Sequence, residues 1–150
     1  MKIIRWILVY PIAIGAGSML MLWLHDVSGQ LIPEASMELL PMDDPEAMKS
    51  HIQELPSSAK WAVMVSHWLG TAFAAFLAML VAPLSREWIQ CKPLLRASFP
   101  GWVLGVVFFF AGAVNAAMIP LPKWMLLTDL AGYLPVAFVA SYLAMNARKS

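Results

Sequence analysis

Charged residues are scarce in this chain of 150 residues, and the stretches that lack them determine its class. Only 13% of the residues are charged and 61% are hydrophobic, whereas a soluble domain has about 25% charged and about 45–50% apolar residues. No Asp, Glu, Lys or Arg occurs from Trp6 to Leu24, from Trp61 to Ser85 or from Ala97 to Pro122, and the run from Trp124 to Ala147 contains only Asp129. Because about 20 apolar residues cross a bilayer as a helix, the sequence predicts four transmembrane helices.

These runs predict one all-α polytopic membrane domain over residues 1–150. We expect helices at about 4–24, 61–84, 99–119 and 124–146, and a long external loop at 25–60 that carries a short helix. The last two helices are joined by a tight turn at 120–123, so they should be antiparallel neighbours in a four-helix bundle. The first run is longer than the apolar region of a secretory signal, which has about 7–15 residues, and we expect it to remain as a helix.

Motifs of several function classes are also absent. The sequence has no nucleophile motif, no Gly-rich phosphate loop and no HExxH motif, so no enzyme class follows from it. The one cysteine, Cys91, cannot form an intrachain disulfide. The basic residues are scattered rather than clustered, which gives no support to nucleic-acid binding.

The basic residues near the ends of the runs are distributed unequally between the two sides of the predicted membrane. Seven fall on the side that holds both termini: Lys2, Arg5, Arg86, Lys92, Arg96, Arg148 and Lys149. Three fall on the other side: Lys49, Lys60 and Lys123. Since cytoplasmic loops carry an excess of Lys and Arg, the sequence predicts a multi-pass protein with both termini in the cytoplasm.

Two local patterns predict structure in finer detail. In the external loop, Asp44 is a suitable N-cap, Pro45 fits the first helical position, and the helix should end before Pro56. Its apolar stripe is Met48, Ile52 and Leu55. Small residues recur at every fourth position of the second transmembrane helix: Ser66, Gly70, Ala74, Ala78 and Ala82. Shorter patterns of the same kind occur at Ala13 and Gly17, at Gly101, Gly105, Gly112 and Ala116, and at Ala137, Ala140, Ser141 and Ala144. Small residues let helix backbones approach closely in lipid, so these faces predict a compact bundle.

Three polar residues fall at similar depths in three of the apolar runs. At 1.5 Å per residue, His67 lies about 10 Å in from Lys60, and Asn115 and Asp129 lie about 7–8 Å in from the same surface. Helical periodicity places Thr71 on the face of His67, and Tyr133 on the face of Asp129. Polar side chains within a membrane usually face the bundle interior or a water-filled cavity. The sequence therefore predicts a polar pocket at the external side, made by His67, Asn115, Asp129, Tyr133 and Thr71.

This pocket has two interpretations. An Asp–His pair with an amide donor can satisfy itself by hydrogen bonds and hold three helices together. Alternatively, it is a binding or catalytic site, because a carboxylate beside an imidazole suits general acid–base chemistry. We therefore predict a small binding or interaction module that presents its acidic external segment to a partner. A membrane enzyme or carrier for a small lipophilic or protonatable substrate is the alternative.

Copper handling is a weaker hypothesis. All three histidines lie toward the external side, together with eight of the eleven methionines. Imidazole and thioether groups suit Cu(I), but methionine is also a common apolar filler in bundles, and no tight ligand spacing occurs. We therefore predict no metal and no cofactor.

Three segments resemble small bacterial four-helix integral membrane proteins without an assigned activity. They are His67-Trp68-Leu69-Gly70-Thr71, Met118-Ile119-Pro120-Leu121-Pro122-Lys123-Trp124, and Asp129-Leu130 with Tyr133-Leu134-Pro135. The resemblance covers the last three helices and implies a location in the bacterial inner membrane, with the lipid bilayer as the first partner. Whether a second protein or another copy of the chain also binds is left open by the sequence.

Overall fold

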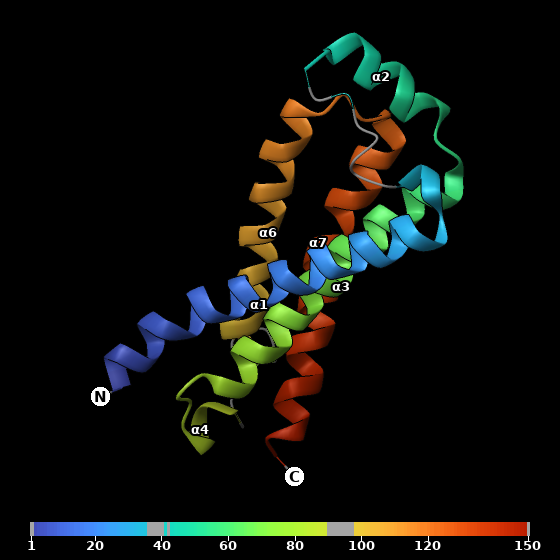
Figure 1. Ribbon diagram of the computed structural model, residues 1–150. Helices are drawn as coiled ribbons and strands as arrows, with labels where there is room; N and C mark the ends of the chain where they lie inside the picture. Colours follow the sequence, from blue (N-terminus) through green and yellow to red (C-terminus); the bar gives the residue numbers. More distant parts are fainter. Residues whose placement is uncertain (1, 36–40, 42, 90–97, 150) are drawn as a thin grey trace.

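Helices are the only regular elements in the part of the chain that the structure describes. This computed structural model describes residues 2–35, 41, 43–89 and 98–149 (Figure 1). The elements are α1 (Lys2–Leu31), the 3₁₀ helix η1 (Pro33–Ala35), α2 (Pro45–Glu54), α3 (Ser57–Val81), α4 (Arg86–Ile89), α6 (Phe99–Met118) and α7 (Lys123–Ala147). The predicted all-α class is therefore confirmed for these residues. Cys91, Lys92 and Arg96 lie outside them.

Four of these helices, α1, α3, α6 and α7, are long and apolar enough to cross a membrane. Their outer faces carry many exposed large apolar side chains, among them Ile3, Ile12, Leu22, Phe110, Val114 and Leu127. Large exposed apolar surfaces are unusual on soluble monomers and mark contact with a membrane or a partner. Together these findings indicate a multi-pass membrane protein.

The helix α1 is longer than the first charge-free run. It continues to Leu31 rather than ending near Leu24, and the predicted loop is correspondingly shorter. The polar residues in the added turns bond within the helix: the Ser28 hydroxyl donates to the carbonyl oxygen of Leu24 (2.7 Å), and the Gln30 amide donates to Asp26 (3.0 Å). A helix ends where its backbone partners end, not where its apolar run ends. This extension places His25 on a helix rather than in a loop.

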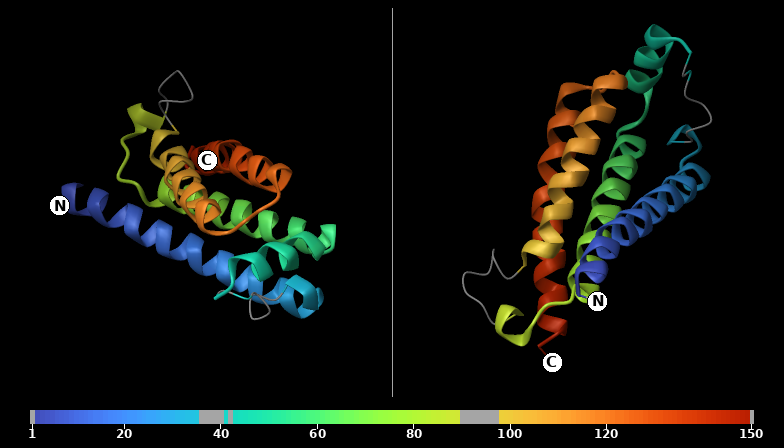
Figure 2. Two further views of the ribbon diagram at one scale, coloured as in Figure 1. Left: turned by 90° about the horizontal axis from the view of Figure 1, so that it is seen from above. Right: turned by 90° about the vertical axis from the view of Figure 1, so that its left-hand side faces the viewer.

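The central helix of the molecule is α3, which packs against α1, α6 and α7. Figures 1 and 2 show α6 and α7 side by side on one side of α3, while α1 crosses α3 obliquely on the other. Both termini lie at the end of the molecule opposite α2 (Figure 1). We call the end with α2 the loop end, and the opposite end the terminal end.

The predicted small-residue face of α3 is confirmed, because Ser66, Gly70, Ala74, Ala78 and Ala82 are all buried. The closest approach is to α1. A Cβ atom built on Gly17 would lie 2.6 Å from the carbonyl oxygen of Gly70, and one built on Gly70 would lie 2.7 Å from the carbonyl oxygen of Gly17. Only glycine at both positions permits this backbone contact.

The short helix predicted to begin at Pro45 and to end before Pro56 is also confirmed, as α2. The Asp44 side chain accepts hydrogen bonds from the backbone N–H groups of Glu46 (2.9 Å) and Ala47 (3.1 Å), and Pro45 occupies the first position. Met48 and Ile52 are buried. The ammonium of Lys60, at the start of α3, donates to the carbonyl oxygen of Gln53 (3.0 Å) and so fixes the end of α2 against α3.

At the terminal end, Arg148 caps α3 from the end of α7. Its guanidinium donates to the carbonyl oxygens of Met79 (2.7 Å) and Ala82 (2.8 Å), which have lost their partners in the helix. Burial lowers the pKa of this guanidinium from its ordinary value, but an arginine stays charged.

We expect Arg148→Met to lower the free energy of unfolding by about 2 kcal/mol, since hydrogen bonds to charged groups contribute about 1.5–3 kcal/mol. Thermal unfolding in detergent, followed by circular dichroism, measures the change. Lys149→Met removes the neighbouring exposed charge and should leave the transition unchanged. Equal effects of the two substitutions would show that the hydrogen bonds from Arg148 to the end of α3 do not stabilise the fold.

Candidate functional site

The structure brings His67 of α3 and Asp129 of α7 together inside the molecule. The Nδ1 atom of His67 lies 2.9 Å from Oδ2 of Asp129, and the side chains are 15% and 8% exposed. An ionised carboxylate accepts, so Nδ1 donates to it, and in the neutral form of the ring this tautomer leaves Nε2 without a proton. A pair of this kind fixes both the tautomer and the orientation of the imidazole.

Neighbouring groups hold this pair in place. The Tyr133 hydroxyl, one turn along α7, donates to Oδ2 of Asp129 (3.3 Å). The Thr71 hydroxyl donates to the carbonyl oxygen of His67 (2.8 Å), so it braces the helix rather than the imidazole. The indole N–H of Trp68 donates to the carbonyl oxygen of Asp129 (3.0 Å) and ties α3 to α7 beside the pair.

The second carboxylate oxygen of Asp129 differs from the first. Oδ1 is buried and has no hydrogen-bond partner among the residues that the structure describes. An unsatisfied buried acceptor costs about 1–3 kcal/mol, and more when the group is charged. Oδ2 accepts hydrogen bonds from His67 and Tyr133, so Oδ1 is the unsatisfied oxygen of this carboxylate. A group that donates a hydrogen bond to Oδ1 would remove this cost.

The pair lies at the edge of a cavity at the loop end, with a volume of about 110 Å³. Its polar lining is His25, Glu34, His51, Lys60, His67, Asn115 and Asp129, and its apolar lining is Ile52, Leu55, Val63, Ile119, Leu121 and Met125. Residues of α1, α2, α3, α6 and α7 thus meet here. Ligand sites in proteins combine apolar walls with placed polar groups, and here six apolar side chains face the same space as seven polar or ionisable ones.

Two of the lining histidines were not among the predicted site residues. The ring of His25 stacks on that of His67, with centroids 5.2 Å apart, and the ring of Tyr133 stacks on His67 at 6.3 Å. His51 reaches the cavity from α2. The signal in the sequence was the presence of all three histidines on one predicted side, but only folding of α1 and α2 onto α3 brings them together.

Asn115 is the predicted site residue that stands apart. It lines the cavity from α6, but its side chain is exposed, and no hydrogen bond joins it to His67 or Asp129 among the described residues. The loop end of α6 has few neighbours, because α1 contacts mainly α3. Val114 and Met118, which also lie there, are exposed as well. Asn115 therefore lies at the rim of the cavity rather than within the hydrogen-bonded group.

The cavity does not have the form of a metal site. Within the described part of the chain, no group of three or more His, Cys, Asp or Glu side chains is arranged to hold an ion. His25 and His67 lie face to face, whereas ligands of one ion would direct their nitrogens to a common point. The arrangement therefore adds no support to the copper hypothesis.

The contact of Trp68 with α7 requires a glycine at position 132. A Cβ atom built on Gly132 would overlap Nε1 and Cε2 of the indole. We expect Gly132→Ala to displace Trp68, break its bond to Asp129 and lower the free energy of unfolding by about 1–3 kcal/mol, the usual cost of overpacking.

A double-mutant cycle with Trp68→Ala tests this expectation, because the cost of Gly132→Ala should vanish when the indole is absent. Unfolding of the four proteins in detergent provides the free energies. If Gly132→Ala costs the same in both backgrounds, the overlap with Trp68 is not its cause.

Comparison with protein-family models, with curated proteins and with solved structures finds no match to this chain. The resemblance of its three segments to small four-helix membrane proteins therefore stays a prediction.

Proposed function

We propose that the protein binds a small amphipathic molecule in the cavity at its loop end, with a hydrogen-bond donor of the ligand on Asp129. The unpartnered Oδ1 of Asp129 carries this proposal. A purely structural Asp–His pair gains nothing from leaving one buried oxygen without a donor, whereas a binding site must keep an acceptor free. The apolar side chains around the cavity would cover the body of the ligand.

We further propose how the protein sits in the cell. The four long apolar helices would cross the bacterial inner membrane as an antiparallel bundle, with both termini in the cytoplasm. The unequal distribution of Lys and Arg supports this orientation, and so does the position of both termini at one end of the molecule (Figure 2). The cavity would then open on the external side.

Benzylamine and ethylbenzene provide the test, because they have nearly the same shape, but benzylamine, as its ammonium ion, donates charge-assisted hydrogen bonds and ethylbenzene donates none. The indole N–H of Trp68 bonds to the backbone oxygen of Asp129 and is a local reporter. We expect its NMR resonance, assigned with Trp68→Phe, to shift with saturation when benzylamine is added in detergent, and to respond weakly to ethylbenzene. Equal responses to both compounds would contradict the proposal.

An acid–base role in a membrane enzyme or carrier is the second candidate. It is favoured by one observation: Nδ1 of His67 is held by Asp129, while no described residue forms a hydrogen bond with Nε2. Such a nitrogen can take a proton from a bound ligand. Protonation of Nε2 when 4-nitrophenol binds, a ligand whose acidity is close to that of an imidazolium, would support this candidate, and a ring that stays neutral would oppose it; the ¹⁵N spectrum of the imidazole distinguishes the two.

A further inference from the structure

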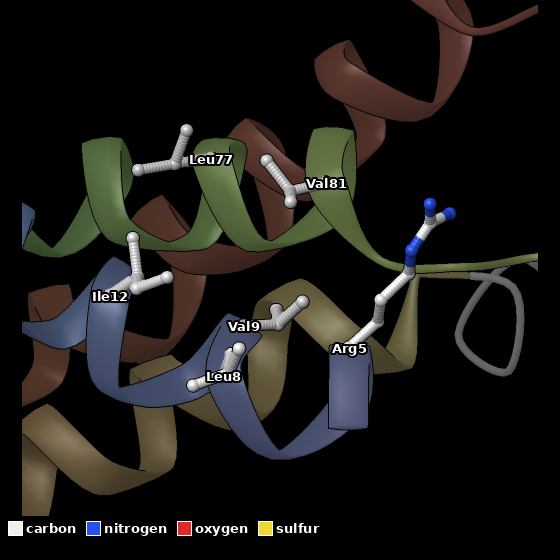
Figure 3. Close-up of a pocket in the computed structure, with 6 residues that line it drawn as sticks. All are labelled: Arg5, Leu8, Val9, Ile12, Leu77 and Val81. Atoms are coloured by element: carbon white, nitrogen blue, oxygen red, sulfur yellow. The ribbon is translucent and has the colours of Figure 1, made fainter. Parts of the chain in front are cut away.

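A second hollow lies at the terminal end, far along the molecule from the cavity at Asp129. It is a groove between the start of α1 and the end of α3, with a volume of about 290 Å³. Figure 3 shows its lining: Leu8, Val9 and Ile12 from α1, Leu77 and Val81 from α3, and Arg5 at one end. Val9 is buried at the bottom, whereas Leu8, Ile12 and Val81 are more than half exposed. The groove is therefore an apolar furrow in the outer surface of the helices.

The only charged side chain of the groove lies where the apolar lining ends. The guanidinium of Arg5 extends away from the apolar residues toward the segment that follows α3 (Figure 3). Arg5 is exposed and makes no salt bridge or hydrogen bond with a described residue. At 1.5 Å per residue, the groove continues for about 10 Å from Arg5 to Ile12 along α1. The groove thus has a positively charged side chain at one end and an apolar lining along the rest of its length.

A wider and more polar hollow adjoins the groove at Arg5. It has a volume of about 510 Å³ and includes Trp6, Ser85 and Trp88 in its lining. Tryptophans of membrane proteins concentrate at the level of the lipid headgroups. Arg5 is shared by both hollows, so it marks the boundary between an apolar compartment and a polar one.

We infer that these two hollows together bind one anionic phospholipid, with its phosphate on Arg5 and one acyl chain in the groove between α1 and α3. Arginine suits this contact because its planar guanidinium binds phosphate oxygens in pairs. An anionic lipid is favoured over a zwitterionic one by the local charge, since the predicted cytoplasmic side carries seven basic residues and only one acidic residue, Glu87. This inference rests on the proposed membrane insertion but is independent of the proposed ligand at Asp129.

Native mass spectrometry of the full chain, released from detergent, tests the inference with phosphatidylglycerol and phosphatidylcholine of identical acyl chains. We expect the wild-type protein to retain phosphatidylglycerol several-fold more than phosphatidylcholine, and Arg5→Gln to abolish the preference. Lys149→Gln removes one charge at the same end, outside both hollows, and should keep it. Ile12→Trp should fill the groove and lower retention of both lipids.

Several results would overturn the inference. They are equal retention of the two lipids by the wild type, equal effects of Arg5→Gln and Lys149→Gln, displacement of the lipid by excess inorganic phosphate, and a dimer that excludes lipid from the groove. Circular dichroism verifies that each variant is folded. The shift of the Trp68 resonance with benzylamine should persist in Arg5→Gln, so failure of the lipid site and failure of the ligand site are separable.

Discussion

Asp129→Asn is expected to weaken benzylamine binding at least about tenfold while leaving the fold intact. The substitution keeps the size of the side chain and an oxygen for the Nδ1–H of His67, but removes the charged acceptor that we assign to the ligand. A hydrogen bond to a charged group contributes about 1.5–3 kcal/mol, and about 1.4 kcal/mol corresponds to a tenfold change in affinity. Titration of the Trp68 indole resonance measures this loss.

Thermal unfolding of the same variant separates function from scaffold. If Asp129 serves binding, its buried and incompletely hydrogen-bonded charge destabilises the folded state. The melting temperature of Asp129→Asn should then equal or exceed that of the wild type. If the pair holds the helices together, the melting temperature should fall. Asp26→Asn is the control for removal of a charge, because it changes an exposed carboxylate that, among the described residues, is bonded only to Gln30.

Gly17→Val should have the largest effect on the fold, because it separates α1 from α3. Even a Cβ atom at this position would lie 2.6 Å from the carbonyl oxygen of Gly70 and 2.7 Å from the Cβ atom of Ala74. A backbone carbonyl cannot rotate away, so the whole helix must shift. We expect a loss of about 3 kcal/mol in the free energy of unfolding, at the upper end of overpacking costs.

The same helix provides a matched control two residues earlier. A Cβ atom on Gly15 meets nothing within 4 Å, so Gly15→Val changes only the helix propensity, which slightly favours valine. Its melting temperature should equal or slightly exceed that of the wild type. Because α1 carries His25, Gly17→Val should also weaken benzylamine binding, whereas Gly15→Val should not. Similar melting temperatures for both variants would contradict the packing of α1 on α3.

The long helices could be predicted from the sequence because a membrane span is encoded by composition alone. The ends of α6 and α7 fall within one residue of the predicted 99–119 and 124–146, whereas α3 begins and ends three to four residues before the predicted 61–84. The end of α1 was not predictable, since the apolar run ends near Leu24 while the backbone hydrogen bonds of the helix continue to Leu31. The cap at Asp44 was predictable for a different reason: it needs only local residue types and spacing. Whatever depends on neighbouring residues along the chain was therefore accessible from the sequence.

The candidate site was accessible only in part. Equal depth along two helices anticipates the contact between His67 and Asp129. Asn115 has a similar depth, but its environment depends on which helix covers the loop end of α6, and α1 packs mainly on α3. The inclusion of His25 and His51 likewise depends on tertiary packing of α1 and α2. Periodicity gives the direction of a side chain on its own helix, not the element that it meets.

The state of the His67 imidazole is the property on which the proposed site depends most directly. In protein with ¹⁵N-labelled histidine in lipid bilayers, solid-state NMR resolves protonated from bare ring nitrogens. The geometry predicts that Nδ1 of His67 carries a proton that is hydrogen-bonded to Asp129, and that Asp129→Asn changes this spectrum. A bare Nδ1, or a ring unaffected by Asp129→Asn, would contradict this hydrogen bond and would remove the basis for the proposed site.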